Sequence, residues 1–296
     1  MIRVILSGGL GNQMFQYAAG RALSLKLQSE LSVDTFLLRK KTKTTVRNFE
    51  LKVFNIKVRE NNHLKNKLIT KSFFFLNKYG LKKLIFGLFG IFRDQKAQNF
   101  DQRFNNIDRN VTLFGYFQNE NYFKAISANL REDFRFINPF NGENANISKK
   151  IDSTASVSIH IRRGDYLNPN VNLSLLNIEY YRRAISYIQE KITDPVFYIF
   201  SDDINWVKKN LDLSQSPHIF IDWNTGNRSF LDMQLMSLCQ HNIIANSSFS
   251  WWGAWLNCNP DKIVIAPGTW YKNETAADYP IGFIPEKWVI LETLSE

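Results

Sequence analysis

The sequence predicts an α/β fold in which a mostly parallel sheet is covered by helices. Between about residues 155 and 270, short apolar runs typical of strands alternate with longer runs of helical spacing. Polar turn residues separate the two kinds of run, as expected for repeated βαβ units. We therefore interpret this half of the chain as a Rossmann-like domain, in which ligands bind at the carboxyl ends of the strands.

The C-terminal half contains five predicted strands with helices between them. The strands are expected at 157–161, 196–200, 219–221, 242–245 and 263–266. The helices are expected at 178–192, 201–211, 229–239 and 249–256, and the second of these opens with the N-cap sequence Ser-Asp-Asp.

The N-terminal half begins in the same way and then loses its periodicity. A strand is expected at 3–6, followed by a glycine-rich turn at 7–12 and a helix at 13–27. Residues from about 36 to 110 are basic, rich in Phe and only weakly periodic, so no strand is predicted there.

A polar segment at 139–153, which contains Asn141-Gly142, predicts a linker. The chain of 296 residues fits two domains of ordinary size, which we place at 1–150 and 151–296. An apolar share of 44% with 22% charged residues is that of a soluble globular protein.

The two cysteines, Cys239 and Cys258, make neither a disulfide framework nor a metal cluster. Cys239 falls in an apolar helical pattern and is expected to be a buried thiol, which suits a reducing, cytoplasmic setting. The apolar runs at 4–6 and 84–92 are too short for a signal peptide or a transmembrane helix.

The net charge of +10 is concentrated in one region. Residues 39–96 contain 16 Lys and Arg but only Glu50, Glu60 and Asp94 as acids. This imbalance predicts attraction to an anionic surface or substrate. Solvated faces of ordinary helices explain the same composition equally well.

The strongest chemical motif follows the strand at 157–161, where His160, Arg162, Arg163, Gly164 and Asp165 come together. Two adjacent guanidinium groups repel each other unless an anion lies between them, and Arg grips phosphate oxygens with two hydrogen bonds. The motif therefore predicts a phosphorylated ligand at this strand end. A purely structural Arg–Asp pair is the alternative.

A second motif, Gly8-Gly9-Leu10-Gly11-Asn12-Gln13, follows a strand and opens a helix. Glycine lets the backbone approach a ligand, and a helix N-terminus offers N–H groups. Met14 stands where a dinucleotide fingerprint needs its third glycine, and no Gly-Lys-Ser/Thr follows as in a P-loop. A tight strand–helix turn without ligand is the alternative.

A third motif, Asn246 to Trp252, also lies between a strand and a helix. Ser247, Ser248 and the backbone at Phe249 form a natural phosphate cradle, although a Ser N-cap before a Trp-rich core helix explains the same residues. Asp232 is an isolated acid on the preceding apolar helix. It is either a solvated residue or a carboxylate that accepts hydrogen bonds from guanine.

These strand ends supply Arg, hydroxyl and backbone N–H groups, all of which suit a diphosphate. The sequence contains neither an Asp-x-Asp motif nor a His/Asp cluster with metal spacing. We therefore expect a site without a metal, where Arg and helix N-termini neutralise the leaving group.

At these motifs, and at Phe200-Ser201-Asp202-Asp203, the chain resembles the bacterial α-1,2-fucosyltransferases of glycosyltransferase family 11. It is similar, more distantly, to α-1,6- and protein O-fucosyltransferases. The resemblance implies a GT-B fold, with two Rossmann-like domains facing across a cleft. It also implies GDP-β-L-fucose as donor, inversion at the anomeric carbon, and no metal or other cofactor.

The resemblance further implies a role for each matching residue. Arg162 falls where the family places an Arg on the β-phosphate, and His160 falls near the nucleoside with Arg163 beside it. Asp232 falls where related enzymes hold guanine, and Asn12, in the loop with Gly9 and Gly11, faces the donor. Ser247, Ser248 and Phe249 fall on the diphosphate loop, and Asp202 and Asp203 match a paired acid.

The implied reaction is attack by an acceptor hydroxyl, O2 of a terminal galactose, on the anomeric carbon of fucose. Arg162 then stabilises the charge that grows on the β-phosphate, and its removal is expected to cost a factor of ~10²–10³ in rate. Asp165 is the nearest carboxylate for a base, but it can equally hold Arg163 in place. An Asp paired with Arg has a lowered pKa and is a poorer base.

The expected partners are GDP-fucose and a galactose-terminated oligosaccharide or lipid-linked glycan, with no nucleic acid. Residues 39–96 are expected to give peripheral contact with an anionic membrane at its cytoplasmic face. Fucosyl transfer with another linkage, α-1,3 or α-1,6, stays open. So does a Rossmann oxidoreductase or epimerase, in which Asp34 holds a ribose hydroxyl, and a polyanion-binding module without transferase activity.

Overall fold

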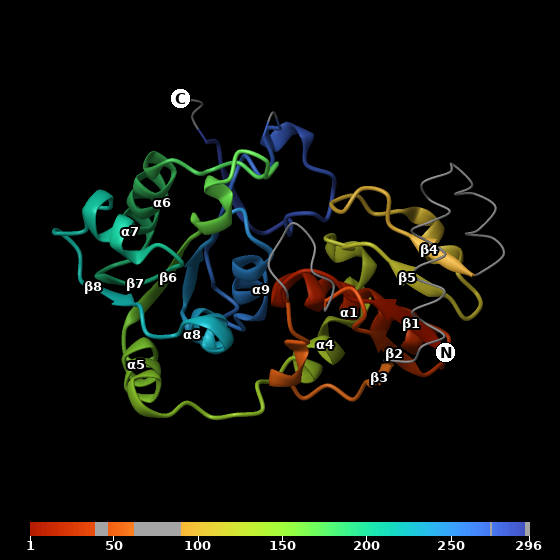
Figure 1. Cartoon of the computed structure of the whole chain (residues 1–296). Coiled ribbons are helices and arrows are strands. Elements are labelled where there is room, and N and C mark those ends of the chain that lie inside the picture. Colours follow the sequence, from red (N-terminus) through yellow and green to blue (C-terminus); the bar gives the residue numbers. More distant parts are fainter. Residues whose placement is uncertain (39–46, 62–89, 273, 294–296) are drawn as a thin grey trace. The chain divides into compact units, whose positions relative to one another are not determined.

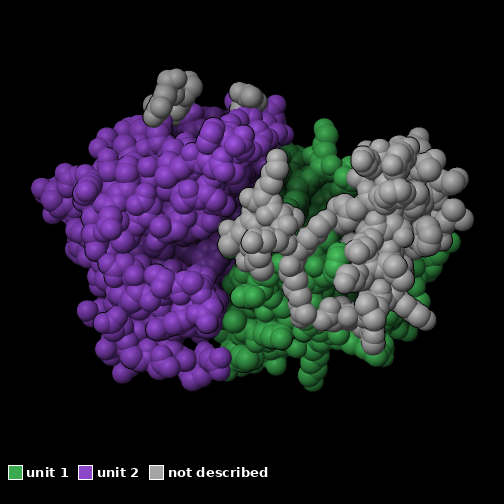
Figure 2. Space-filling model, viewed as in Figure 1, with its two compact units in different colours: residues 1–137, 280–283 green, residues 138–279, 284–296 purple. Residues whose placement is uncertain are grey.

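The computed structural model describes residues 1–38, 47–61, 90–272 and 274–293 (Figure 1). The chain forms two compact units, coloured separately in Figure 2. Unit 1 comprises residues 1–137 and 280–283, and unit 2 comprises 138–279 and 284–296. Most of the basic region at 39–96, for which membrane contact is expected, lies outside the described residues.

Unit 1 contains a five-stranded parallel sheet of order β3-β2-β1-β5-β4. The strands are β1 (Ile2–Ile5), β2 (Leu31–Asp34), β3 (Arg59–Asn61), β4 (Ile91–Arg93) and β5 (Thr112–Phe114). Within the described residues, the α-helices of this unit are α1 (Leu10–Lys26) and the short α4 (Ser127–Asp133). The predicted first strand and first helix are confirmed, and β3 and β4 are strands that the weak periodicity concealed.

Unit 2 contains a six-stranded sheet of order β11-β10-β9-β6-β7-β8, and all of its pairings are parallel. The strands are β6 (Ala155–Ile161), β7 (Pro195–Ser201), β8 (His218–Ile221), β9 (His241–Ile243), β10 (Val264–Pro267) and β11 (Val289–Leu291). The helices are α5 (Gly142–Asp152), α6 (Ile178–Lys191), α7 (Ile204–Asn210), α8 (Phe230–Leu238) and α9 (Ser248–Leu256).

The predicted strands and helices of this half are confirmed to within a few residues at each end. Both faces of the sheet are covered, which explains why its strands read as nearly continuous apolar runs. One face packs Val157, Ile159 and Ile161 of β6 against buried residues of α6 such as Tyr181 and Ile185. The predicted buried thiol is also confirmed, because Cys239 has no exposed surface.

The predicted linker at 139–153 is wrong, because most of it forms α5 in unit 2. Ile147 and Ile151, four residues apart, are both buried, and Asn144 is only 1% exposed. The apolar stripe of α5 is too narrow to stand out in a polar segment, yet it packs the helix against α8. The predicted domain boundary at residue 150 therefore lies inside α5, whereas the two units divide after Ile137.

Each sheet has a point at which the chain reverses the direction in which it adds strands. In unit 2 the chain forms β6, β7 and β8 in one direction and then returns to place β9 on the other side of β6. In unit 1 the chain forms β1, β2 and β3 in one direction, crosses to form β4 at the other edge, and then places β5 between β4 and β1. Ligands of open α/β sheets bind outside the carboxyl ends of the strands at such a reversal. No helix among the described residues is long and apolar enough to cross a membrane.

Candidate active site

Arg162 follows the last residue of β6 and lies at the reversal of the unit 2 sheet. Its guanidinium donates to Asp165 Oδ1 from Nη2 at 2.7 Å and from Nε at 3.1 Å, and its Nη1 lies 3.1 Å from Asp202 Oδ2. Burial opposes the charge of Arg162, but Asp202 and Asp165 outweigh it and raise its pKa. The side chain keeps 28% of its surface exposed, so the oriented cation is still accessible to a ligand.

Asp202, at the end of the adjacent strand β7, builds the turn that holds Arg162. Its Oδ1 accepts the backbone N–H of Arg163 at 2.9 Å, while its Oδ2 faces Arg162. A Cβ at Gly164 would lie 2.4 Å from Asp202 Oδ2, so only glycine fits there without displacing the carboxylate. Of the paired acid predicted from the sequence, Asp202 is therefore a structural support of Arg162.

Arg163 is turned toward α7. Its guanidinium carbon lies 3.5 Å from the ring centroid of Trp206, and its Nε lies 3.2 Å from Asp203 Oδ2. Asp203 is in turn the N-cap of α7 and accepts the N–H of Trp206. The expectation that Asp165 holds Arg163 is thus corrected, because Asp165 bonds Arg162 and Asp203 holds Arg163.

His160, near the end of β6, lies against Phe249 in the first turn of α9. Their ring centroids are 5.6 Å apart. Burial, with a smaller contribution from Arg162, lowers the pKa of His160 to about 3, so the ring is neutral at physiological pH. Its Nδ1 is buried and has no hydrogen-bond partner among the described residues. A buried ring nitrogen in this state is ready to bond a ligand.

The third motif joins the same cluster through its backbone. Ser247 is the N-cap of α9, and its hydroxyl accepts the N–H of Phe249 at 3.3 Å. Tyr166, directly after the Arg162–Asp165 turn, donates its hydroxyl hydrogen to the carbonyl of Asn246 at 2.9 Å. The turn after β6 and the N-terminus of α9 are therefore locked together. Ser248 lies half-buried in the first turn of α9.

Asp232 lies in the first turn of α8. Helices that follow parallel strands begin at the carboxyl edge of the sheet, so Asp232 is at the same edge as Arg162. Its Oδ1 accepts a hydrogen bond from Asn224 Nδ2 at 2.8 Å. Burial raises the pKa of Asp232 to about 7, against the lowering effect of Asn224.

In unit 1, the glycine loop lies at the reversal between β1 and β5. Gly8 has φ +78°, and a Cβ there would lie 2.5 Å from Asn12 Nδ2, so the loop requires glycine at this position. Asn12 Oδ1 accepts a hydrogen bond from Gln118 Nε2 at 2.8 Å, which joins the segments after β1 and β5. Gly9 is the N-cap of α1, and Gly11 is buried in its first turn.

The N-terminus of α1 is not free for an anion. Glu50 Oε2 accepts the N–H of Leu10 at 3.0 Å, and the backbone N–H of Glu50 donates to Gln13 Oε1 at 3.0 Å. A carboxylate at this helix end neutralises the partial positive charge of the helix dipole, and it also repels a phosphate. Binding of a phosphate by the backbone of this loop, which includes Gly9 and Gly11, is therefore disfavoured.

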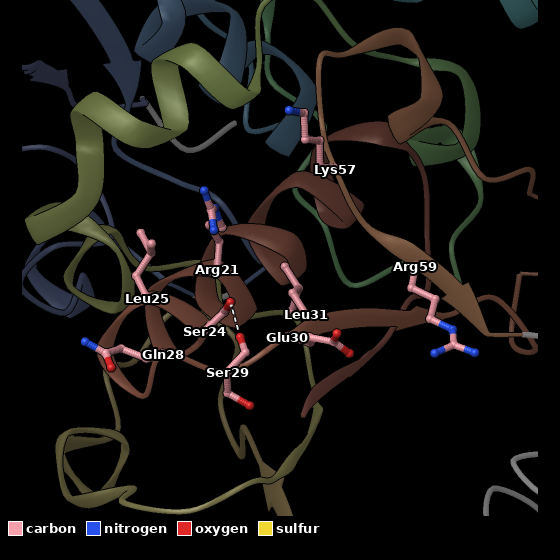
Figure 3. A pocket seen from close by; sticks show the side chains of 9 residues that line it. All are labelled: Arg21, Ser24, Leu25, Gln28, Ser29, Glu30, Leu31, Lys57 and Arg59. Carbon is pink, nitrogen blue, oxygen red and sulfur yellow. Dashed lines mark hydrogen bonds between the residues drawn. The ribbon is translucent and has the colours of Figure 1, made fainter.

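A surface hollow of about 510 Å³ lies at the opposite edge of unit 1 (Figure 3). Lys57 and Arg59 line it together with the end of α1 and the start of β2. It faces the amino ends of the strands, which is the edge that does not carry ligand sites in open α/β sheets. Arg21 in this hollow is already paired with Asp133 at 2.8 Å.

Within the described residues, no group of three or more His, Cys, Asp or Glu side chains is placed to hold a metal ion. Asp34 is 1% exposed and accepts the N–H of Phe36, so it is not placed to hold a ribose.

The structure brings His160, Arg162, Asp165, Ser247 and Phe249 together at one edge of unit 2. Asp232 shares that edge, and Asn12, Gly9 and Gly11 belong to unit 1. Sequence reasoning missed Tyr166, Gln118 and Asn224. Only Tyr166, adjacent to the motif, carried a local signal, because Gln118 bonds Asn12 across 106 positions and Asn224 is held by Asn144 across 80.

Known proteins resemble this chain over nearly its whole length. The model of glycosyl transferase family 11 matches residues 1–292. An alpha-1,2-colitosyltransferase of Escherichia coli is 39% identical over 97% of each chain. The O-antigen biosynthesis glycosyltransferase WbnK of Escherichia coli is 35% identical over 90% of this chain and 93% of its own.

A solved structure shares the fold at low sequence identity. A point mutant of Arabidopsis thaliana FUT1, in complex with GDP, has a TM-score of 0.50 and 12% identity over 89% of this chain and 69% of its own. Two Rossmann-like units in one chain are the composition of a GT-B glycosyltransferase, so the predicted fold class is confirmed.

Proposed function

The chain belongs to glycosyl transferase family 11 and is a glycosyltransferase, and we propose that it transfers L-fucose from GDP-β-L-fucose to O2 of a terminal galactose with inversion. The observation that carries the proposal is Arg162, an accessible guanidinium fixed by two carboxylates at the reversal of the unit 2 sheet. A cation held in this way is preorganised for the negative charge of a departing diphosphate.

The bonds change in a single displacement. The acceptor oxygen bonds to the anomeric carbon from the face opposite GDP, the bond from that carbon to the β-phosphate oxygen breaks, and the proton of the acceptor hydroxyl passes to the solvent. Arg162 stabilises the charge on the departing oxygen, and the N-terminus of α9 with Ser247 and Ser248 binds the remaining phosphate oxygens.

Neighbouring residues bind the rest of the donor. Asp232 accepts hydrogen bonds from the base, and neutral His160 faces the nucleoside with its unpartnered Nδ1. Asp165 bonds Arg162 through one oxygen, which favours a positioning role over that of base. Asn12, held by Gln118, offers a neutral amide to the sugar or acceptor.

The linkage and the donor sugar have support of different strength. The 39% identical relative is named for an α-1,2 linkage, which agrees with transfer to O2. The same name makes colitose a second candidate for the transferred sugar. Colitose differs from L-fucose only in lacking the 3-hydroxyl group, so both suit one phosphate site.

We also propose that the reaction needs no metal, because Arg162 and the α9 N-terminus supply the positive charge. A peripheral location at the cytoplasmic face of a membrane, near lipid-linked glycans, remains a proposal based on the composition of residues 39–96.

The test is incubation of the full chain with GDP-fucose or GDP-colitose and a panel of galactosides, with products identified by mass and linkage. An α-1,2-linked fucoside supports the proposal, and turnover of GDP-colitose alone selects the second candidate. Addition of a chelator is expected to leave the rate unchanged, and loss of activity that a divalent cation restores would contradict the metal-free site.

A further inference from the structure

A chain of hydrogen bonds leads from α5 to the carboxylate of Asp232. Trp223 Nε1 donates to Asn144 Oδ1 at 2.9 Å. Asn144 and Asn224 exchange two hydrogen bonds of 2.9 Å, one from each amide nitrogen to the other amide oxygen. Asn224 Nδ2 then donates its second hydrogen to Asp232 Oδ1 at 2.8 Å. Both Asn144 and Asn224 are buried, with 1% and 5% of their surfaces exposed.

Trp223 fixes the direction of this chain. An indole N–H can only donate, so Asn144 must present its oxygen to Trp223. The nitrogen of Asn144 then faces the oxygen of Asn224, and the nitrogen of Asn224 faces Asp232. A flip of either amide would place two oxygens or two N–H groups against each other. The group that faces Asp232 Oδ1 is therefore the N–H donor of Asn224 and not its oxygen.

The remaining oxygen of Asp232 is available to a ligand. Oδ2 makes no hydrogen bond with the described residues, and Oδ1 keeps a further lone pair. The elements that pack most closely on α8 are α5, α9 and the 3₁₀ turn Gly226–Arg228. Helix α9 carries no ionisable side chain. The pKa of Asp232 is set by burial and by Asn224. It is not shifted by the charged side chains of the neighbouring elements, which are Arg228 of the 3₁₀ turn and Glu143, Lys149, Lys150 and Asp152 of α5.

We propose that Asn224, oriented by Asn144 and Trp223, is a positioning residue that keeps Asp232 an ionised acceptor and so selects a base with two adjacent N–H donors. Guanine presents such a pair at N1 and N2, hypoxanthine presents only N1–H, and adenine presents an acceptor at N1. This inference rests on the proposed function, in which Asp232 faces the base of the donor.

The test is calorimetric binding of GDP and IDP to the full chain between pH 6 and 9. Wild type is expected to bind GDP about 10-fold or more tightly than IDP, because one hydrogen bond to a charged acceptor is lost with IDP. Asn224→Ala should weaken GDP binding about 10-fold at pH 7 and much less at pH 9, since loss of the donor raises the pKa of Asp232 further. The preference for GDP at pH 7 should shrink in parallel.

Two more variants complete the design. Trp223→Phe removes only the N–H that sets the direction of the chain, and we expect a weaker effect of the same kind, about 3-fold at pH 7. Asn257→Ala is the matched control, because Asn257 is also a buried amide of unit 2 and donates to Asn242 Oδ1 at 2.8 Å. It should keep the wild-type preference and pH profile.

The outcomes separate the two proposals. Wild type that fails to bind GDP overturns the proposed function and this inference with it. If wild type binds GDP, and Asn224→Ala and Trp223→Phe keep the wild-type preference for GDP and the wild-type pH profile, this inference alone is overturned. A loss of affinity that is equal at every pH, as a merely structural role would give, also overturns it.

Discussion

The two parallel sheets each reverse their strand order beside their first strand, but they carry different chemistry at the carboxyl edge of that reversal. In unit 2 the reversal between β6 and β9 carries Arg162, two supporting carboxylates and the N-terminus of α9. In unit 1 the reversal between β1 and β5 carries the glycine loop and the amides of Asn12 and Gln118. There the helix N-terminus is occupied by the carboxylate of Glu50.

In open α/β sheets the topology sets the edge at which ligands bind, and the local charge at that edge favours one kind of ligand over another. A helix N-terminus attracts phosphate only when its N–H groups are free, and α1 has given one of them to an internal anion. This difference supports our proposal that the diphosphate binds at unit 2, and we propose that a neutral sugar or acceptor binds at unit 1.

The largest expected effect comes from removing the cation of unit 2. Arg162→Ala should lower kcat by a factor of ~10²–10³, because the charge on the departing phosphate loses its main donor. Steady-state kinetics with GDP-fucose and circular dichroism measure activity and fold. Arg183→Ala in α6 is the control, since the one hydrogen bond of Arg183 within the described residues goes to the carbonyl of Glu292. Retained activity in Arg162→Ala would remove the basis for placing the diphosphate in unit 2.

The next effect concerns Asp232, the residue of unit 2 that we propose binds the guanine base. Asp232→Asn should weaken GDP binding about 10-fold or more, because an amide cannot accept two hydrogen bonds from guanine as a carboxylate does. Calorimetry with GDP at pH 7 and pH 8 measures the loss. Unchanged affinity would show that this acid does not face the base.

The same substitution should stabilise the free protein at pH 8. The pKa of Asp232 is raised to about 7 in the folded state, so its stabilising contribution is complete only below its ordinary pKa of 3.8 and is lost as the pH rises through 7. Replacing the charged, mostly buried carboxylate should therefore add about 1–3 kcal/mol at pH 8 and much less at pH 4. Urea unfolding at the two pH values measures the difference.

The sequence predicted unit 2 well because its information is local. Each of its signals is contained within a few residues: the apolar strand runs, the N-cap Asp203 of α7, the N-cap Ser247 of α9, and the turn from Arg162 to Asp165. The missed residues act over long separations: Gln118 reaches Asn12 across 106 positions, and Asn224 reaches Asn144 across 80. A neutral Asn or Gln gives no pattern until folding brings its partner near. The helix α5 was missed for a related reason, since two buried isoleucines do not outweigh its polar residues.

A smaller effect is expected at the neutral edge of unit 1. Asn12→Ala should lower kcat about 10-fold through loss of one oriented amide, while GDP affinity stays within about twofold of wild type. Gln118→Ala should act in the same direction but more weakly, because it only positions Asn12. Kinetics combined with GDP calorimetry separate the two quantities. A large loss of GDP affinity in Asn12→Ala would contradict the proposal that GDP binds to unit 2 alone.

The smallest effect on activity is expected for Arg163, although it is adjacent to Arg162 in the chain. Its guanidinium stacks on Trp206 and pairs with Asp203, and only 12% of its side chain is exposed. Arg163→Ala should lower the free energy of unfolding by about 1–3 kcal/mol, because a desolvated cation–π contact and an ion pair are lost and Asp203 loses its partner. Activity per folded molecule should stay within about threefold of wild type, since the contacts of Arg162 with Asp165 and Asp202 do not involve the Arg163 side chain. Arg163→Lys should recover part of the stability but not the stacking. Urea unfolding and kinetics on the same preparations test both statements, and a loss of activity as large as that of Arg162→Ala would mean that Arg163 contacts the diphosphate after all.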